Sequence, residues 1–227
     1  MSTTTTLAFD VYGTLIDTHG VVDALRGMVG DRAQDFSQTW RDKQLEYSFR
    51  RGLMQQYESF AVCTRQALDY TCAYYQADLS ETARTALLEQ YRELPAFDDV
   101  LPALTRLKSA GYRLFAFSNG TAEAVSHLLI AAGLIDCFLD VVSVDEIKSF
   151  KPNPAVYTHF LRRAGALGQA SWLISSNPFD VIGAQAAGLR GAWVQRSPHA
   201  LFDPWGMQPN LQVGSLIELT DQLEQQR

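Results

Sequence analysis

Proline is absent from the first 94 residues, although the whole chain contains eight. A proline inside a helix removes a backbone hydrogen bond and clashes with the preceding turn, so its absence permits long unbroken helices. Phe36, Trp40 and Tyr47 fall on one helical stripe within this segment. We therefore predict that residues 18–94 form a small helical unit.

We expect three helices in this unit. Glycine often ends a helix, so Gly52 is the predicted end of the first. Leu53, Tyr57 and Phe60 begin the helical spacing of the second, and the third includes Leu87.

Basic clusters and long apolar runs are also scarce. Lys and Arg number 19 against 25 Asp and Glu, for a formal net charge of −6, so nucleic acid is not an expected partner. No segment has the composition of a signal peptide or the length of a membrane span. The sequence therefore predicts a cytoplasmic protein that does not contact a membrane.

The chain has only three cysteines, Cys63, Cys72 and Cys137, and they lack C-x-x-C spacing. An odd number with this spacing argues against a disulfide framework and a zinc site, so we expect reduced core residues. The four histidines likewise lack the spacing of a catalytic triad or of an H-E-x-x-H metal motif.

After Pro95 the pattern changes to short apolar runs that alternate with helical segments. The predicted strands are "TLAFDV" near the start of the chain and then "YRLFAF", "FLDVVS", "SWLIS" and "GAWVQ". This alternation is typical of a parallel sheet covered by helices. We predict a doubly wound α/β core from residues 1–17 and 95–227, with residues 18–94 inserted as a helical cap.

Polar side chains follow several of these strands at their carboxyl ends, where open parallel sheets bind ligands. The motif "DVYGT" at 10–14 follows the first strand, "SNG" at 118–120 and "SSNPFD" at 175–180 follow two others, and "KPNP" at 151–154 lies in a loop. Asp10 closes an apolar strand, where an unpaired charge is costly to desolvate. It either caps a turn or is held there to react.

Taken singly, each motif has an ordinary structural explanation. The segment "SNG" fits a turn, Asn153 followed by proline fits the start of a helix, and Lys151 fits a solvated loop. Together they place an acid, a lysine and small hydrogen-bonding groups at one edge of one sheet, and this combination favours a functional site.

With these four motifs at this spacing, the chain resembles the haloacid dehalogenase superfamily over nearly its whole length. The resemblance implies a Rossmann-like core with an inserted cap. It also implies that Asp10 is a nucleophile whose charge Lys151 offsets. Thr14 and Ser118 would support that nucleophile.

Two positions separate the phosphatases of this superfamily from its dehalogenases. Where phosphatases carry a second aspartate that protonates the leaving group, this chain has Tyr12, a poor proton donor with a reference pKa of about 10. Where they carry a metal-binding aspartate, it has Ser175 and Ser176, so a hard cation would be poorly held and no cofactor is expected. A departing halide needs no proton. The chain therefore resembles the (S)-2-haloacid dehalogenase branch.

This branch implies hydrolysis of short L-2-haloalkanoic acids to D-2-hydroxy acids. A carboxylate oxygen of Asp10 attacks C2 and expels halide, which inverts C2 and leaves an aspartyl ester. Water then cleaves that ester. By resemblance the catalytic residues are Asp10, Thr14, Lys151, Ser175, Asn177 and Asp180.

Arg41 heads an apolar row on its helix, with Leu45 and Phe49 one and two turns further on. Without the resemblance, an arginine that snorkels at the rim of the cap is the simpler interpretation. With it, Arg41 and Asn119 form the expected halide cradle. The residues expected to contact the substrate are Tyr12, Arg41, Leu45, Phe60, Ser118, Asn119, Tyr157 and Phe179.

Two positions depart from the branch: Phe179 stands where relatives often carry tryptophan, and Asp42 where they carry a neutral amide. Two other functions stay open, a phosphatase of the same superfamily that acts on a small phosphoester and a catalytically silent protein that binds an anion or a partner. A homodimer is a further expectation from the resemblance.

Overall fold

The computed structural model describes residues 4–226, and within them six parallel strands form one sheet in the order β3-β2-β1-β4-β5-β6. The five predicted strands are all present, and a short sixth strand joins the edge of the sheet. The strands are β1 Thr6–Phe9, β2 Arg113–Ser118, β3 Asp140–Ser143, β4 Ser171–Ser175, β5 Arg190–Val194 and β6 Leu211–Val213.

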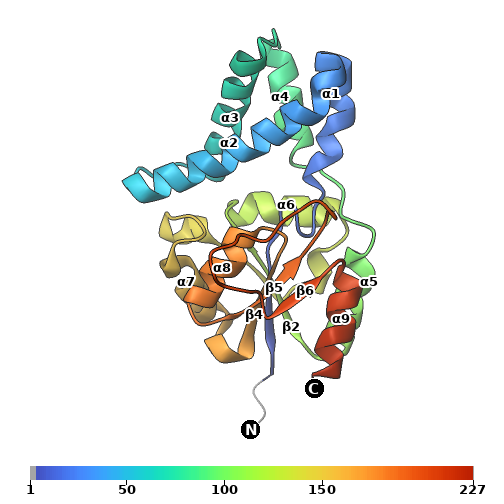
Figure 1. Cartoon of the computed structure of the whole chain (residues 1–227), viewed down its shortest axis with the longest axis vertical. Helices are drawn as coiled ribbons and strands as arrows, with labels where there is room; N and C mark the ends of the chain where they lie inside the picture. The colour runs from blue at the N-terminus through green and yellow to red at the C-terminus, as the bar shows by residue number, and fades with distance from the viewer. Residues whose placement is uncertain (1–3, 227) are drawn as a thin grey trace.

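Helices cover both faces of the sheet, as the prediction of a doubly wound fold requires (Figure 1). The side chains of Leu7 and Phe9 pack with α5, α6 and α9, whereas the side chain of Ala8 points to the other face and packs with α7 and α8. The core helices are α5 Val100–Ser109, α6 Ala122–Ala131, α7 Pro154–Ala164, α8 Pro178–Ala186 and α9 Leu216–Gln225.

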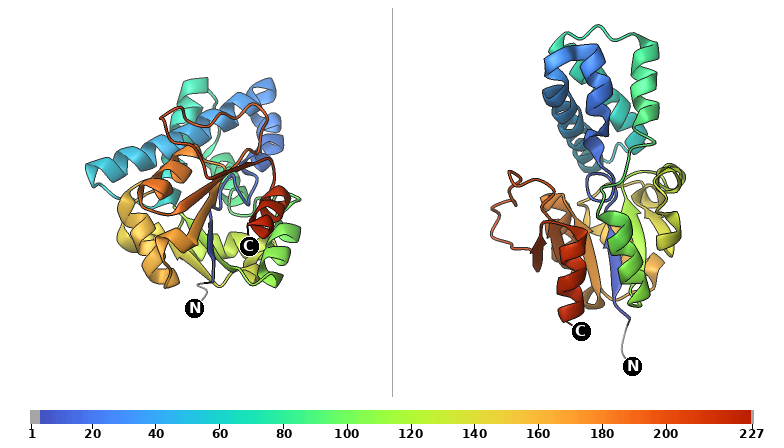
Figure 2. Two further views of the ribbon diagram at one scale, coloured as in Figure 1. Left: turned by 60° about the horizontal axis from the view of Figure 1, so that its bottom comes forward. Right: turned by 90° about the vertical axis from the view of Figure 1, so that its right-hand side faces the viewer.

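Four further helices pack together at one end of the molecule, above the carboxyl ends of the strands, while both chain termini lie at the opposite end (Figures 1 and 2). We call these four helices the cap. Its boundaries at residues 18–94 stay a prediction. The cap helices are α1 Val22–Val29, α2 Ala33–Met54, α3 Phe60–Tyr75 and α4 Glu81–Gln90, so α1 adds one helix to the three predicted.

The chain enters and leaves the cap at adjacent points. The backbone N–H of Asp17 donates to the carbonyl of Pro95 at 2.8 Å, and the N–H of Phe97 donates to the carbonyl of Leu15 at 3.1 Å. Ile16 and Ala96 form an antiparallel bridge between these two connections. The two linkers are therefore held side by side.

The predicted end of the first long helix at Gly52 is wrong, because α2 continues to Met54. Gln55 takes the left-handed conformation (φ 55°) that glycine usually supplies, and its N–H caps the helix. Leu53 therefore belongs to the last turn of α2, and α3 begins only at Phe60.

All three cysteines are free, with Cys63 and Cys72 buried and Cys137 half-buried. Between residues 4 and 226, no helix has both the length and the apolar character needed to cross a bilayer.

Candidate active site

Asp10 lies one residue beyond the carboxyl end of β1, between β2 and β4. The strand order reverses direction at this point, which is where open α/β sheets bind ligands. Gly13 has φ +83°, and a Cβ added there would lie 3.4 Å from Ser176 Oγ. Glycine therefore allows the chain to turn back sharply and brings Thr14 to the carboxylate of Asp10.

The two carboxylate oxygens of Asp10 have different surroundings. Oδ2 accepts hydrogen bonds from Thr14 Oγ1 at 2.9 Å, from Ser175 Oγ at 3.1 Å and from Asn177 Nδ2 at 2.8 Å. Oδ1 accepts one, from Lys151 Nζ at 3.1 Å. Three donors fix the orientation of the carboxylate, and Oδ1 keeps more of its lone-pair capacity for another partner.

Lys151 is 1 % exposed, so the alternative of a solvated loop lysine is wrong. Its Nζ donates to Asp10, to Asp180 Oδ2 at 2.7 Å and to the carbonyl of Phe117 at 2.8 Å, which uses all three ammonium protons. Burial alone would lower the pKa of Lys151, but the two carboxylates outweigh it and raise that pKa above its usual value. The ammonium is therefore charged and lies between two anions.

The donor set does not fit a divalent cation. Within residues 4–226 no three His, Cys, Asp or Glu side chains are grouped so that they could hold a metal. Asp10 and Asp180 both bind the ammonium of Lys151 instead, and Ser175 donates its proton to Asp10. A hard cation prefers several oxygen ligands that are free to coordinate it.

Asp180 is fully buried at the start of α8. Burial raises its pKa to about 6, and Lys151 opposes that shift while the charge of Asp10 adds to it. Tyr157 OH donates to Asp180 Oδ1 at 2.8 Å. Tyr157 is fully buried and adjoins the carboxylate of Asp180, and its contact with the substrate stays a prediction.

The raised pKa of Asp180 predicts a loss of activity in mild acid. If its ionised form is required, the rate at saturating substrate, kcat, should fall below about pH 6. Tyr157→Phe removes a hydrogen bond that favours the ionised form, so it should move this acid limb to higher pH. Initial rates across the pH range, for the natural protein and this variant, would measure both effects.

Protonation of Asp180 should not unfold the protein, so unfolding driven by this group should not cause the loss of activity in mild acid. A carboxyl group whose folded pKa exceeds its unfolded value of about 3.9 stabilises the fold increasingly as the pH falls through the folded value. Circular dichroism over the same range is the control. A flat rate profile between about pH 5 and about pH 8 would contradict the prediction.

The cap contributes Arg41, on α2. Its Nη2 donates to the carbonyl of Tyr12 in the loop after β1 at 3.3 Å, and its Nη1 donates to Gln44 Oε1 at 2.6 Å. Asn177 Nδ2 also donates to the carbonyl of Tyr12, at 3.5 Å. The guanidinium therefore reaches across the junction of cap and core, beside the loop that carries Asp10.

Two polar side chains follow β2. Ser118 Oγ accepts the N–H of Gly120 at 3.1 Å, so its own hydroxyl proton remains available to donate. Asn119 Oδ1 accepts the N–H of Lys151 at 3.0 Å. This bond fixes the side-chain amide of Asn119 and leaves its nitrogen as the donor end.

Aromatic side chains of both parts meet across the junction. The rings of Tyr12 and Phe60 lie 5.9 Å apart, and Phe49 meets Phe179 edge-on at 4.9 Å. Leu45 is half-buried, one helical turn after Arg41. Burial raises the pKa of Tyr12 well above its usual value, which makes its hydroxyl a weak proton donor.

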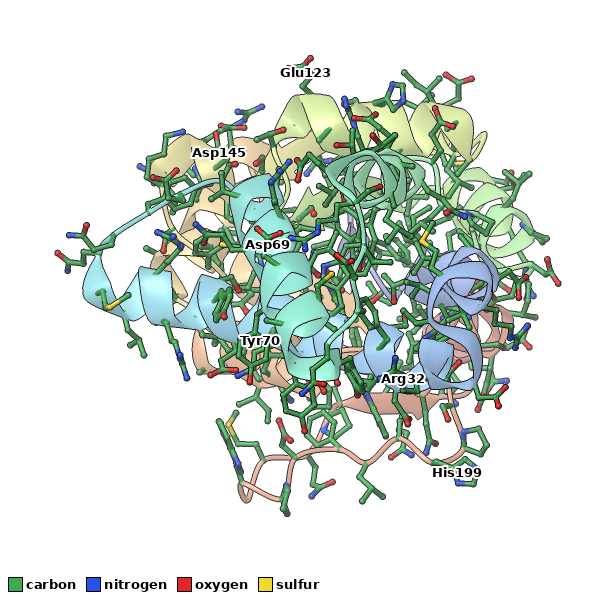
Figure 3. All side chains as sticks on the ribbon, turned by 90° about the horizontal axis from the view of Figure 1, so that it is seen from above. Arg32, Asp69, Tyr70, Glu123, Asp145 and His199 are labelled. Atoms are coloured by element: carbon green, nitrogen blue, oxygen red, sulfur yellow. The ribbon has the colours of Figure 1, made fainter. Side chains whose placement is uncertain are left out.

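A cavity of about 510 Å³ opens between cap and core, and both parts line it, with Phe60 and Gln44 from the cap and Tyr12 and Gly120 from the core. Figure 3 looks down from the cap side and shows α2 and α3 crossing over this edge of the core. Glu123 of α6 and His199 of the loop after β5 lie on opposite sides in that view.

Gln44 is a site residue that sequence reasoning missed. It lies on the same helical stripe as Phe36 and Trp40 and is completely buried. A polar residue that interrupts a buried stripe was the available signal, because a buried amide requires hydrogen-bond partners.

Comparison with known proteins agrees with this geometry. A family model for haloacid dehalogenase-like hydrolases matches residues 4–188. The chain belongs to this family of hydrolases. It is similar to haloacetate dehalogenase H-2 of Moraxella sp. (strain B), with 39 % identity over 91 % of this chain and 92 % of that protein.

Within the family, the chain falls in the (S)-2-haloacid dehalogenase branch. The (S)-2-haloacid dehalogenase of Pseudomonas sp. (strain YL) is 35 % identical over 96 % of this chain and 94 % of that protein. A structure of the L-2-haloacid dehalogenase of Xanthobacter autotrophicus, with chloropropionic acid covalently bound, has a TM-score of 0.89 and 30 % identity. It covers 98 % of this chain and 99 % of that one.

Proposed function

We propose that this chain hydrolyses short L-2-haloalkanoic acids to D-2-hydroxy acids through an ester on Asp10, with inversion at C2. The observation that carries the proposal is the carboxylate of Asp10, whose Oδ2 accepts three hydrogen bonds while Oδ1 faces the buried ammonium of Lys151. The relative with covalently bound chloropropionic acid supports an ester intermediate.

In the first step, Oδ1 of Asp10 attacks C2 from the side opposite the halogen. The new C–O bond forms as the carbon–halogen bond breaks, and the halide leaves with that electron pair. Arg41 and the nitrogen end of Asn119 are the donors that would receive the halide. Ser118 and the backbone after Asp10 would bind the substrate carboxylate.

In the second step, water attacks the carbonyl carbon of the ester. Asn177 and Asp180 would orient this water and accept its proton, and Lys151 would stabilise the oxyanion that forms on the side chain of Asp10. The ammonium of Lys151 already lies within hydrogen-bond distance of both carboxylates. The bond between the acyl carbon and the substrate oxygen then breaks, and the departing alkoxide takes the proton that Asp180 accepted from water and leaves as the 2-hydroxy acid. The carboxyl group of Asp10 releases its proton to solvent, which regenerates the carboxylate.

The site favours this reaction over phosphoryl transfer. A phosphatase of this family needs a proton donor for its alkoxide leaving group and a divalent cation for the phosphoryl oxygens. Here the pKa of Tyr12 is raised by burial, and Lys151 occupies the space between Asp10 and Asp180. A departing halide needs no proton.

Halide release tests the proposal directly. The purified protein would be given chloroacetate and the L- and D-forms of 2-chloropropionate, and in parallel an aryl phosphate with Mg²⁺. We expect chloride from chloroacetate and L-2-chloropropionate, and D-lactate as the chiral product. Phosphate release without chloride release would favour the phosphatase, and no release from either would favour a silent binding protein.

Chelation should leave dehalogenation unchanged. Because Asp10 and Asp180 bind an ammonium, exhaustive treatment with a chelator should alter kcat/KM by less than about twofold. Chloride release before and after chelation is the measurement, with a Mg²⁺-dependent phosphatase treated in the same way as the control. Loss of turnover that Mg²⁺ restores would contradict the prediction.

A further inference from the structure

Arg41 is held by a chain of hydrogen bonds that begins inside the cap. Its Nη1 donates to Gln44 Oε1 at 2.6 Å. Gln44 Nε2 donates in turn to Thr64 Oγ1 on α3, and Thr64 Oγ1 donates to the carbonyl of Phe60 at 2.8 Å. Gln44 is completely buried and Thr64 nearly so. This series of hydrogen bonds therefore links α2 and α3 to the guanidinium of Arg41.

The direction of each bond in this chain is fixed. A hydroxyl has one proton, and Thr64 donates it to the carbonyl of Phe60, so towards Gln44 it can only accept. Gln44 must then present its NH₂ group to Thr64 and its carbonyl oxygen to Arg41. Burial makes any other arrangement costly, because it would leave polar groups unpaired.

The acceptor at Gln44 is neutral. A carboxylate at this position would neutralise the guanidinium, whereas an amide oxygen fixes it and leaves its positive charge intact. The guanidinium has five N–H donors, and the bonds to Gln44, to the carbonyl of Tyr12 and to the hydroxyl of Tyr91 engage three of them. Donors therefore remain to bind an anion near Asp10.

We propose that Gln44 is a positioning residue that holds Arg41 ready to receive the departing halide, and that Thr64 fixes the orientation of Gln44. This inference rests on the proposed function. It means that buried residues of the cap affect anion binding beside Asp10 by holding Arg41 in place.

The first arm of the test is a double-mutant cycle. Gln44→Met removes the acceptor with little change in length, and kcat/KM should fall about 10- to 100-fold, as expected for a hydrogen bond to a charged group. In an Arg41→Ala background the same substitution should have almost no further effect, because Gln44 acts through Arg41. Gln38→Met is the matched control on α2, since Gln38 is exposed and its side chain donates to Asp42.

The second arm uses Thr64. Thr64→Val has the same shape but no hydroxyl, and it should lower kcat/KM about three- to tenfold. Thr64→Ser keeps the hydroxyl and should restore most of the activity. Thermal unfolding of every variant is measured, and if Gln44→Met does not fold, the Thr64 pair decides the question.

Binding of bromide, followed by calorimetry, separates this inference from the proposed function. If the natural protein releases no halide, the proposed function is wrong, and weaker bromide binding by Gln44→Met would still uphold the role of Gln44. Equal losses of activity with and without Arg41, or bromide binding unchanged by Gln44→Met, would overturn it.

Discussion

In a single turnover with enzyme in excess in ¹⁸O-water, we expect the 2-hydroxy acid to be released unlabelled. The oxygen that enters the product comes from the carboxylate of Asp10, and the oxygen from water remains on the enzyme because the ester is cleaved at its carbonyl carbon. The peptide that contains Asp10 should therefore gain one ¹⁸O. Mass spectrometry of the product and of the digested protein would measure both.

A general-base role for Asp10 predicts the opposite labels. Water directed onto C2 would place ¹⁸O in the product at once and leave the peptide unlabelled, and this result would exclude the covalent mechanism even if dehalogenation were confirmed. Asp10→Asn has no anionic oxygen, so we expect no measurable turnover from it. Asp23→Asn, at an exposed position on α1, is the matched control and should keep normal activity.

Lys151→Met should abolish turnover and destabilise the fold. The substitution leaves the carboxylates of Asp10 and Asp180 buried without their shared cation. Removing one partner of a buried ion pair typically costs about 3–5 kcal/mol of the free energy of unfolding. Urea unfolding of the variant, with halide release by the folded fraction, would measure the two effects.

The pH dependence of the lost stability in Lys151→Met identifies its cause. Without the ammonium, one of the two carboxyl groups should have a folded pKa well above its unfolded value of about 3.9, so the variant should regain stability as the pH falls through the folded value. Lys108→Met is the control, because Lys108 is exposed on α5 and should cost less than about 0.5 kcal/mol. A loss of stability that does not change with pH would indicate that lost packing is the cause instead.

The sheet could be predicted because its strands are short apolar runs with sharp polar ends. β6 could not, since its three residues include only one that is fully buried. Gly52 misled the prediction of the helix end because Gln55, a residue without special turn propensity, takes the left-handed conformation. Local pattern gives the type of an element more reliably than its last residue.

The candidate site could likewise be predicted only in part. Asp10 and the motifs after β2 and β4 could be assigned to one edge, because parallel strands bring their carboxyl ends together. The places of Tyr157 and Gln44 depend on which side chains face each other between packed helices. A single sequence shows that Gln44 is polar, but it does not show that Arg41 and Thr64 are its partners.

The paired linkers at Ile16 and Ala96 have a consequence for how this architecture can change over evolutionary time. A segment that leaves and rejoins a domain at neighbouring positions can be lengthened, exchanged or lost without redirecting the strands. Asp10 and Lys151 lie in loops of the core, whereas Arg41 and Phe60 belong to the inserted segment. Mutation and recombination can therefore change what the insert contributes to the proposed site while the carboxylate of Asp10 is inherited unchanged.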